Sequence, residues 1–354
     1  MSSKAKATKK TVYVGMSGGV DSSVTAALLK QAGYDVVGVY MKNWSQDLPG
    51  FTCPWKEDFQ DAKRVAVQLG IPFKLYDFET EYRRKVVDYM VSEYQAGRTP
   101  NPDIMCNQEV KFKLFLATCL EDGADLIATG HYARVADGQL LTARDDNKDQ
   151  TYFLYRVTAD ALEHTLFPLG ELTKPEVRAL AKKFGLATAT KKESMGICFV
   201  GKVGIREFLL NELGPQPHGR IIDQHGLDIG EHDGAIYYTI GQRHGLDVGG
   251  GLPYYVTGKD MKRNEVYVTT DLSDTQLWSR EIKLADPHWI NAAPTAGKTY
   301  QVRTRHRASM IDCEISHKQN VWYITLKDEV RALTPGQSAV IYNGDHVLGG
   351  GIIT

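Results

Sequence analysis

Apolar runs and helical repeats alternate along the first half of the chain. Short apolar runs typical of buried strands lie at Thr11–Met16, Asp35–Met41, Phe73–Phe78 and Ala124–Gly130. Helix-forming patterns cover Val24–Leu29, Glu57–Leu69, Glu79–Gln95 and Lys111–Glu121. Such alternation predicts an α/β domain, in which a parallel sheet carries helices on both faces and ligands bind at the carboxyl ends of the strands.

The pattern changes near the segment GPQPHG at 214–219. Beyond it the helical repeats stop, and β-rich runs appear between glycine turns at Ala235–Ile240, Tyr254–Thr257, Tyr300–Arg303, Val321–Leu326 and Ser338–Tyr342. A second break lies around 270–275. We therefore expect an α/β domain over residues 11–213, a central β domain over 214–275 and a small antiparallel barrel over 276–354.

Composition and charge narrow the class of protein. Residues 1–10 form a basic tail without the apolar stretch of a secretory signal, and we expect this tail to be disordered. No apolar run reaches membrane-spanning length. Five widely spaced cysteines without a CxxC pair favour reduced thiols in a cytoplasmic protein; Cys119 and Cys313 fit buried, inert thiols. The formal net charge of −1 neither requires nor excludes a nucleic-acid partner.

The first candidate site is the segment SGGVDSS at 17–23, which follows a predicted strand and opens a helix. Gly18 and Gly19 allow close approach of the backbone, and Ser and Asp side chains occupy the helix-capping zone. Amides at a helix N-terminus bind phosphate oxygens. The spacing excludes a Walker A loop, which needs a second glycine and a lysine. The pattern SGGxDS instead resembles the loop of ATP pyrophosphatases that release AMP and pyrophosphate; the alternative is a glycine turn before a helix cap.

Two cysteines lie in settings that favour reactivity. Cys106 follows the proline-punctuated segment TPNPDIM at 99–105, which we expect to be an irregular loop. Cys198 follows a basic pair at 191–192. A thiol on an irregular loop near positive charge tends toward the nucleophilic thiolate, although buried inert cysteine is the commoner state. Asp103 is close enough to share the site of Cys106, but a turn-forming Asp is the commoner role at this spacing.

Basic and aromatic residues could contact a nucleic acid. His131 follows the strand that ends at Gly130, and the spacing does not choose between a proton carrier, a base-stacking ring and a hydrogen-bonded loop residue. Arg303, Arg305 and Arg307 alternate along a predicted strand, which would place the three guanidiniums on one face as a phosphate track. The alternative is a solvated strand face.

Several motifs together resemble the tRNA-specific 2-thiouridylase (MnmA) family. They are GMSGGVDSS at 15–23, TPNPDIMCNQEVKF at 99–112, ATGHYARV at 128–135, NKDQTYFLYRV at 147–157, GICFVG at 196–201, YTIGQRHGL at 238–246 and TPGQSAVIYNGDHVLGGGII at 334–353. The resemblance runs from about residue 11 to the C-terminus. It implies a Rossmann-like ATP-pyrophosphatase (PP-loop) domain, then two small β-rich domains, the last a tRNA-binding antiparallel barrel.

The resemblance implies an enzyme that replaces oxygen by sulfur at C2 of the wobble uridine, position 34, in glutamate, lysine and glutamine tRNAs. The uridine O2 would attack the α-phosphate of ATP and release pyrophosphate, with Mg²⁺ offsetting phosphate charge and no metal ligand set in the protein. Cys198 corresponds to the persulfide carrier. Cys106 corresponds to its partner, which releases sulfide or resolves a disulfide after transfer, and Asp103 to an acid/base.

Binding positions follow from the same resemblance. The implied ATP-binding residues are Gly15, Met16, Ser17, Gly18, Gly19, Val20, Asp21, Ser22, Met41 and Gly130. The implied tRNA contacts are Asn101, Pro102, Asp103, His131, Lys148, Asp149, Gln150, Arg305, His306 and Gln337. The segment 101–103 and His131 would surround a flipped-out base. The implied partners are a tRNA anticodon stem-loop and, as persulfide donor, a sulfur-relay protein or cysteine desulfurase, with no membrane.

Two other functions use the same features. An amide- or guanidine-forming synthetase resembling argininosuccinate synthetase would share the ATP loop but need neither the paired thiols nor a basic β module. A non-catalytic tRNA-binding protein would keep the ATP-binding fold without catalysing a reaction. The intact loop and both cysteines speak against the second alternative.

Overall fold

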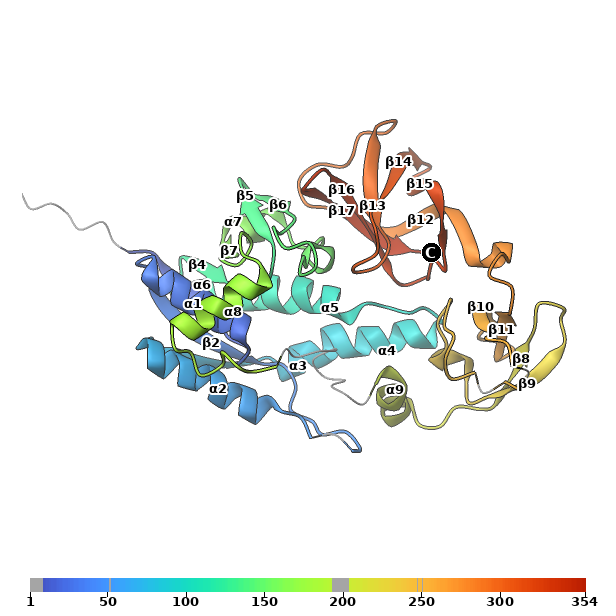
Figure 1. Cartoon of the computed structure of the whole chain (residues 1–354), viewed down its shortest axis with the longest axis horizontal. Helices are drawn as coiled ribbons and strands as arrows, with labels where there is room; N and C mark the ends of the chain where they lie inside the picture. The colour runs from blue at the N-terminus through green and yellow to red at the C-terminus, as the bar shows by residue number, and fades with distance from the viewer. Residues whose placement is uncertain (1–8, 51, 193–203, 247, 250) are drawn as a thin grey trace, which may run out of the picture.

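The computed structural model describes residues 9–50, 52–192, 204–246, 248–249 and 251–354. The described strands form three sheets, and Figure 1 shows an α/β unit at the N-terminal end, a small β unit, and a barrel at the C-terminal end. Cys198 and residues 1–8 of the predicted tail lie outside the described residues. No helix among the described residues is long and apolar enough to cross a membrane.

The first sheet has five strands in the order β3-β2-β1-β4-β7, all of them parallel. They are β1 (Thr11–Gly15), β2 (Asp35–Lys42), β3 (Phe73–Asp77), β4 (Leu126–Ala128) and β7 (Thr165–Leu166). The parallel sheet confirms the prediction. From β1 the chain adds β2 and β3 on one side of the sheet and then returns to add β4 on the other side. The crevice at the carboxyl ends of β1 and β4 is therefore the topological switch point, where such folds bind ligands.

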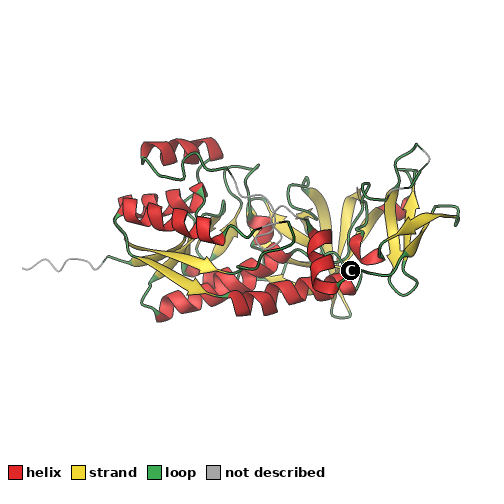
Figure 2. Cartoon of the chain, turned by 90° about the horizontal axis from the view of Figure 1, so that it is seen from below, coloured by secondary structure: helices red, strands yellow, loops and turns green. Residues whose placement is uncertain are grey.

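Helices cover both faces of this sheet (Figure 2). Because side chains alternate along a strand, Val12 and Val14 of β1 join one core and Tyr13 joins the other. On the first face lie α1 (Val20–Gln31), α2 (Trp55–Leu69) and α8 (Lys174–Lys183). On the second face lie α3 (Glu79–Tyr82), η1 (Arg83–Val87), α4 (Asp88–Gln95), α5 (Pro102–Met105), η2 (Cys106–Phe115) and α6 (Leu116–Glu121).

The expected irregular loop around Cys106 is wrong. Pro102 occupies the first helical position of α5, where the missing N–H removes no intrahelical bond. The Asn101 side chain caps this end by accepting a hydrogen bond from the Asp103 N–H (3.2 Å). The helix then continues through η2, a π-helical stretch of 10 residues that begins at Cys106. π-helical turns are rare and frequently occur at functional sites.

The second sheet has four strands in the order β10-β11-β8-β9. They are β8 (Gly219–Ile222), β9 (Asp228–His232), β10 (Tyr255–Asp260) and β11 (Glu265–Thr269), and the helix α9 (Ile205–Leu213) precedes them. The sheet is mixed, because β11 pairs with β8 in parallel. The predicted strand over 235–240 is wrong: this segment forms the 3-10 helix η4 (Ala235–Tyr237) directly after Gly234, whose φ is +132°.

The third sheet contains a six-stranded antiparallel barrel, closed where β12 pairs with both β15 and β17. Its strands are β12 (Trp278–Trp289), β13 (Thr299–Arg303), β14 (Ile311–Lys318), β15 (Val321–Arg331), β16 (Ser338–Asn343) and β17 (His346–Ile353). The short helix η5 (Thr275–Leu277) leads into it. The predicted barrel is confirmed.

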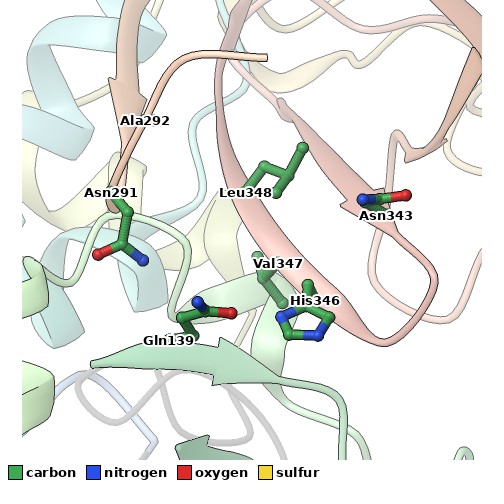
Figure 3. A pocket seen from close by; sticks show the side chains of 7 residues that line it. All are labelled: Gln139, Asn291, Ala292, Asn343, His346, Val347 and Leu348. Atoms are coloured by element: carbon green, nitrogen blue, oxygen red, sulfur yellow. The ribbon is translucent and has the colours of Figure 1, made fainter. Parts of the chain in front are cut away.

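A hairpin from the α/β unit extends the barrel sheet. The strands β5 (Arg134–Ala136) and β6 (Gln139–Leu141) pair with each other, and β6 pairs with β17. A cavity of about 300 Å³ lies at this junction, with Gln139, Asn291 and His346 among the side chains around it (Figure 3). The segment after the hairpin carries η3 (Thr151–Phe153) and α7 (Ala159–Glu163). The two units are therefore joined by backbone pairing, which the sequence pattern did not predict.

Candidate functional site

The loop between β1 and α1 presents an uncapped helix end. Gly19 is the N-cap of α1 and no side chain caps it. The Ser22 and Ser23 hydroxyls donate instead to the Gly19 carbonyl (3.3 and 2.7 Å), and Ser22 also accepts from the Ser17 N–H (3.1 Å). The first-turn N–H groups and the positive end of the helix dipole are thus available to an anion. The predicted anion site would therefore consist of backbone groups, with the hydroxyls shaping the loop.

Asp21 holds the loop to two neighbouring segments. Its carboxylate accepts hydrogen bonds from the Tyr132 hydroxyl (3.0 Å) and from Lys174 Nζ (2.7 and 2.8 Å). Tyr132 follows β4 and Lys174 begins α8, so one carboxylate fixes the loop against both. Asp21 is therefore a structural anchor of the site.

The loop and the turn after β4 meet in one cavity, as we expected from their places at strand ends. A cavity of about 580 Å³ is lined by both, including Ser17, Ser22, Gly130 and His131. A Cβ on Gly130 would lie 2.8 Å from the Ser22 N atom, so only glycine allows this approach. Met41, expected near the adenosine, also lines the cavity. The volume lies within the range of pockets that bind cofactor-sized ligands.

The lining of this cavity is strongly basic. Lys111, Lys148, Lys192 and Arg307 all contribute to it. Asp21 supplies a carboxylate there, but that group is already paired with Lys174. Because the cations outnumber this single carboxylate, which Lys174 already pairs, the cavity suits a polyanion such as a nucleotide or an RNA strand.

His131 is held as a neutral ring. It is 9% exposed, and burial together with the charge of Lys111 holds its pKa well below the ordinary value. Lys111 Nζ lies 3.4 Å from Nε2, and the Thr129 hydroxyl lies 2.7 Å from Nδ1. Since an ammonium only donates, Nε2 accepts and Nδ1 carries the proton toward Thr129. Of the three roles left open by the sequence, a proton carrier at neutral pH is the one this environment disfavours.

Cys106 is buried at the start of η2 and its side chain is 6% exposed. Burial raises the pKa of its thiol, while Lys111 and a hydrogen bond with Tyr82 oppose that rise. The expected thiolate tendency is therefore wrong for this conformation. Burial likewise raises the pKa of the neighbouring Asp103 carboxyl, which makes its carboxylate a stronger base toward a thiol proton.

The other described cysteines behave as predicted. Cys53, Cys106, Cys119 and Cys313 are all free thiols. Cys119 and Cys313 are buried in helix and strand cores, and burial raises the pKa of Cys313 to about 12. Both are inert packing residues.

The expected tRNA contacts divide into two groups. Lys148, Gln150 and His306 line the basic cavity. Asp149 is buried within the protein, with 2% of its surface exposed. Its carboxylate accepts hydrogen bonds from the Ala143 N–H (3.1 Å), the Thr151 hydroxyl and the Arg303 guanidinium (3.2 Å). A direct contact of the Asp149 side chain with tRNA is not compatible with this burial, and its role here is to anchor Arg303.

The predicted arginine track is wrong. β13 ends at Arg303, so Arg305 and Arg307 lie on the turn beyond it, and Arg307 has a φ of +63°. Arg303 points inward to Asp149, whereas Arg305 donates to the Ala332 carbonyl and the Thr334 hydroxyl. Arg307 is the member that lines the cavity.

Gln337 joins the barrel to the segment before α5. Its Nε2 donates to the Thr99 carbonyl (2.7 Å) and more weakly to the Pro100 carbonyl (3.3 Å). Arg156 makes a second connection, because it binds Gln108 of η2 and Asp286 of β12 (2.7 Å). The helix that carries Cys106 is thus tied to the barrel at both places.

Several lining residues were missed from the sequence. Phe153 lines the cavity and packs against the His306 ring with centroids 4.4 Å apart. Lys111 supplies charge there, beside Lys192 and Arg307, which the sequence had marked as part of a basic pair and of the arginine track. Lys111 and Phe153 lie within motifs singled out above, but no local pattern marks which residue of a motif faces a cavity.

A nucleotide-sized basic cavity at the switch point of a parallel sheet, with an uncapped helix end in it, defines a nucleotide-binding α/β protein. The family model described as "tRNA methyl transferase HUP domain" matches residues 10–202. The models described as the PRC-barrel domain and the aminomethyltransferase beta-barrel domain match residues 206–270 and 279–353. The HUP fold implies the use of ATP.

Curated relatives narrow this class to one family. The tRNA-specific 2-thiouridylase MnmA of Streptococcus sanguinis is 47% identical over 358 residues, which cover 98% of this chain and 95% of the relative. The protein of the same name from Bacillus cytotoxicus is 47% identical over 350 residues, covering 97% and 94%. The chain therefore belongs to the tRNA-specific 2-thiouridylase family.

Among solved structures, an NMN synthetase from Francisella tularensis aligns with a TM-score of 0.35 and 17% identity. The alignment covers 52% of this chain and 66% of that chain. This similarity is too low to carry an argument.

Proposed function

We propose that this chain converts the wobble uridine, position 34, of glutamate, lysine and glutamine tRNAs to 2-thiouridine, with ATP as activating substrate. The observation that carries the proposal is the cavity in which the uncapped N-terminus of α1 and the Gly130–His131 turn meet under a basic lining. One end of it suits phosphates and the other suits a flipped-out base. Family membership supplies the substrate class.

The first half-reaction activates the base. The uridine O2 forms a bond to the α-phosphorus of ATP, the bond to pyrophosphate breaks, and pyrophosphate leaves with the electron pair while N3 loses its proton. The loop residues Gly15–Ser22, with Met41 and Gly130, are the proposed ATP site. The α1 amides would stabilise the charge on phosphate, and the resulting AMP group is a better leaving group than a carbonyl oxygen.

The second half-reaction transfers sulfur. Cys198 would carry a persulfide, and the Cys106 thiolate would attack its inner sulfur. The Sγ–Sγ bond forms and the outer S–S bond breaks, which frees hydrosulfide to attack C2 and displace AMP. Asp103 would take the Cys106 proton. If the persulfide instead attacks C2 directly, Cys106 resolves the bond to Cys198 afterwards. Either route ends in a Cys106–Cys198 disulfide, which an external dithiol must reduce.

Magnesium would arrive with the nucleotide. No group of three or more potential metal-ligating side chains occurs among the described residues, and Asp21 in the cavity is already paired with Lys174. The donor set therefore fits a cation held by phosphate oxygens and water, as is usual for Mg²⁺. When bound, it would offset phosphate charge.

The proposed partners follow from the same chemistry. The barrel and the segment at 147–157 would hold the anticodon stem-loop, with Asn101, Pro102, Lys148, Gln150, Arg305, His306 and Gln337 at or near it. Residues 11–213, 214–275 and 276–354 are the proposed domains. A sulfur-relay protein or a cysteine desulfurase would load Cys198. Free thiols at the described cysteines are consistent with a reducing, cytoplasmic setting.

Mass spectrometry of nucleosides tests the proposal. Unmodified glutamate tRNA is incubated with the protein, ATP and a persulfide source, then digested, and 2-thiouridine at position 34 is quantified. We expect one AMP per 2-thiouridine and none of the product with Cys198→Ser. Absence of 2-thiouridine would refute the proposal, and product formation by Cys198→Ser would exclude the thiol chemistry.

A further inference from the structure

Lys111 occupies a position in η2 that its sequence spacing alone would not give it. It lies five residues after Cys106, and the i→i+5 bonding of a π-helix places residues five apart about one turn from each other. In an α-helix the same pair would point in clearly different directions, because each residue turns the helix by about 100°. The π-helical register therefore brings the ammonium toward the side of the helix that carries the thiol.

The Lys111 side chain lines the basic cavity, and its charge acts on the buried acid–thiol pair. Its Nζ lies 3.4 Å from His131 Nε2, and its side chain lines the cavity. Its charge also acts on Asp103 and on Cys106, lowering the pKa of each against the effect of burial. The charge of Lys111 thus acts on both described residues to which we assign sulfur chemistry, Cys106 and Asp103.

Few other groups face this thiol. Asp103 disfavours a negative charge on Cys106, and the Tyr82 hydroxyl, from the helix packed against η2, favours it by hydrogen bonding. His131 is neutral. Glu109 on the same helix is neutralised by Lys85 and Lys113. Lys111 is therefore the full positive charge that acts on the Cys106 sulfur among the described residues.

We propose that Lys111 stabilises the sulfur anions of the transfer step, namely the Cys106 thiolate as it forms and the hydrosulfide as it leaves toward the base. This inference rests on the proposed thiolation. It requires no new reactant: the proton still passes from Cys106 to Asp103, and the electron pair of the broken S–S bond leaves with hydrosulfide. Lys111 takes no part in this proton transfer and lowers the energy of both anions by proximity.

The first experiment measures the thiol directly and does not need tRNA. The full chain is pulse-labelled with iodoacetamide across neutral and alkaline pH, and the Cys106 peptide is quantified by mass spectrometry. With Lys111→Met the inflection should move to higher pH and labelling at neutral pH should fall at least about tenfold, because a cation close to an anion shifts its ionisation by a unit or more. Lys111→Arg keeps the charge and should restore the original profile.

Lys113→Met is the matched control. Lys113 lies two residues along the same helix, is 64% exposed and pairs with Glu109, so its loss should leave the Cys106 profile unchanged. An unmoved inflection in Lys111→Met would overturn the inference. Equal shifts in Lys111→Met and Lys111→Arg would also overturn it, because the effect would then come from side-chain shape. Equal shifts in Lys111→Met and Lys113→Met would do the same, because the effect would then come from the general charge of the helix.

The second experiment separates the two half-reactions. In single turnover with persulfide-loaded enzyme, Lys111→Met should slow 2-thiouridine formation at neutral pH far more than it slows tRNA-dependent pyrophosphate release, and alkaline pH should partly restore 2-thiouridine formation. Equal slowing of pyrophosphate release and of 2-thiouridine formation would move Lys111 to the activation step and overturn the inference. If the wild-type chain forms no 2-thiouridine, the proposed function fails, whereas the labelling profiles still decide whether Lys111 controls the thiol.

Discussion

Gly18 is the position where one added carbon should damage the proposed ATP loop most directly. Its φ is +75°, a conformation that L side chains rarely adopt. A Cβ there would also overlap the Asp58 carbonyl oxygen at the start of α2 and lie 2.9 Å from its carbonyl carbon. Because backbone on α2 cannot move aside as a flexible side chain would, Gly18→Ala must displace the loop from the N-terminus of α1.

The loss of folding stability in Gly18→Ala has two parts, and a second glycine of the chain allows us to separate them. A left-handed conformation costs an alanine about 1–2 kcal/mol. Overpacking against fixed neighbours adds about 1–3 kcal/mol. Gly33, at the end of α1, has a φ of +92° but no atom within 4 Å of an added Cβ, so Gly33→Ala carries the first part alone. We expect Gly18→Ala to be about 2–5 kcal/mol less stable than wild type and Gly33→Ala about 1–2 kcal/mol.

Urea unfolding and tRNA-dependent pyrophosphate release together test this reasoning. Displacement of a catalytic loop by about 1 Å costs on the order of 100-fold in rate. Gly18→Ala should show that loss at a temperature where it remains folded, and Gly33→Ala should keep near-normal turnover. If both variants lose the same stability and Gly18→Ala still releases pyrophosphate at the wild-type rate, the close approach to Asp58 does not shape the site.

Three further predictions use buried polar groups. Asp149→Ala leaves Arg303 without its carboxylate and should cost about 3–5 kcal/mol in urea unfolding, whereas adding Arg303→Met to it should recover part of that loss. Burial and Lys111 hold the pKa of His131 well below its ordinary value, so the ring stays neutral at neutral pH and thiolation should show no inflection in the usual histidine range; His131→Gln should keep the shape of the profile. Burial raises the pKa of Cys106, so its thiolate is scarce at neutral pH and single-turnover sulfur transfer should rise as pH becomes alkaline.

Local pattern was sufficient for most elements of the α/β unit. The apolar runs at 11–16 and 35–41 became β1 and β2, and the helical repeat at 57–69 became α2. These segments bury their faces in one domain, so periodicity reports the structure directly. The turn at 17–23 between a strand and a helix was likewise predictable, because paired glycines interrupt the strand and Ser and Asp residues favour the start of a helix; anion binding there stays a prediction.

Long-range pairing was not predictable. β5 and β6 are three residues each and join the barrel through β17, more than 200 residues later, so neither strand has a pattern of its own. The alternation of arginines at 303–307 suggested one strand, yet β13 ends at Arg303, whose side chain pairs with the buried Asp149. The domain bounds at 213 and 275 stay predictions.

The sequence by itself determined the parallel sheet, the glycine turn between β1 and α1 and, through its motifs, the family. These depend on residues that are neighbours in the chain or on apolar faces with a regular period. Only the tertiary structure decided the state of the reacting groups. Burial raises the pKa of Cys106 and the charge of Lys111 opposes that rise, while burial and Lys111 together lower the pKa of His131. Burial and charge at one atom depend on every segment packed around it, and no local pattern records that sum.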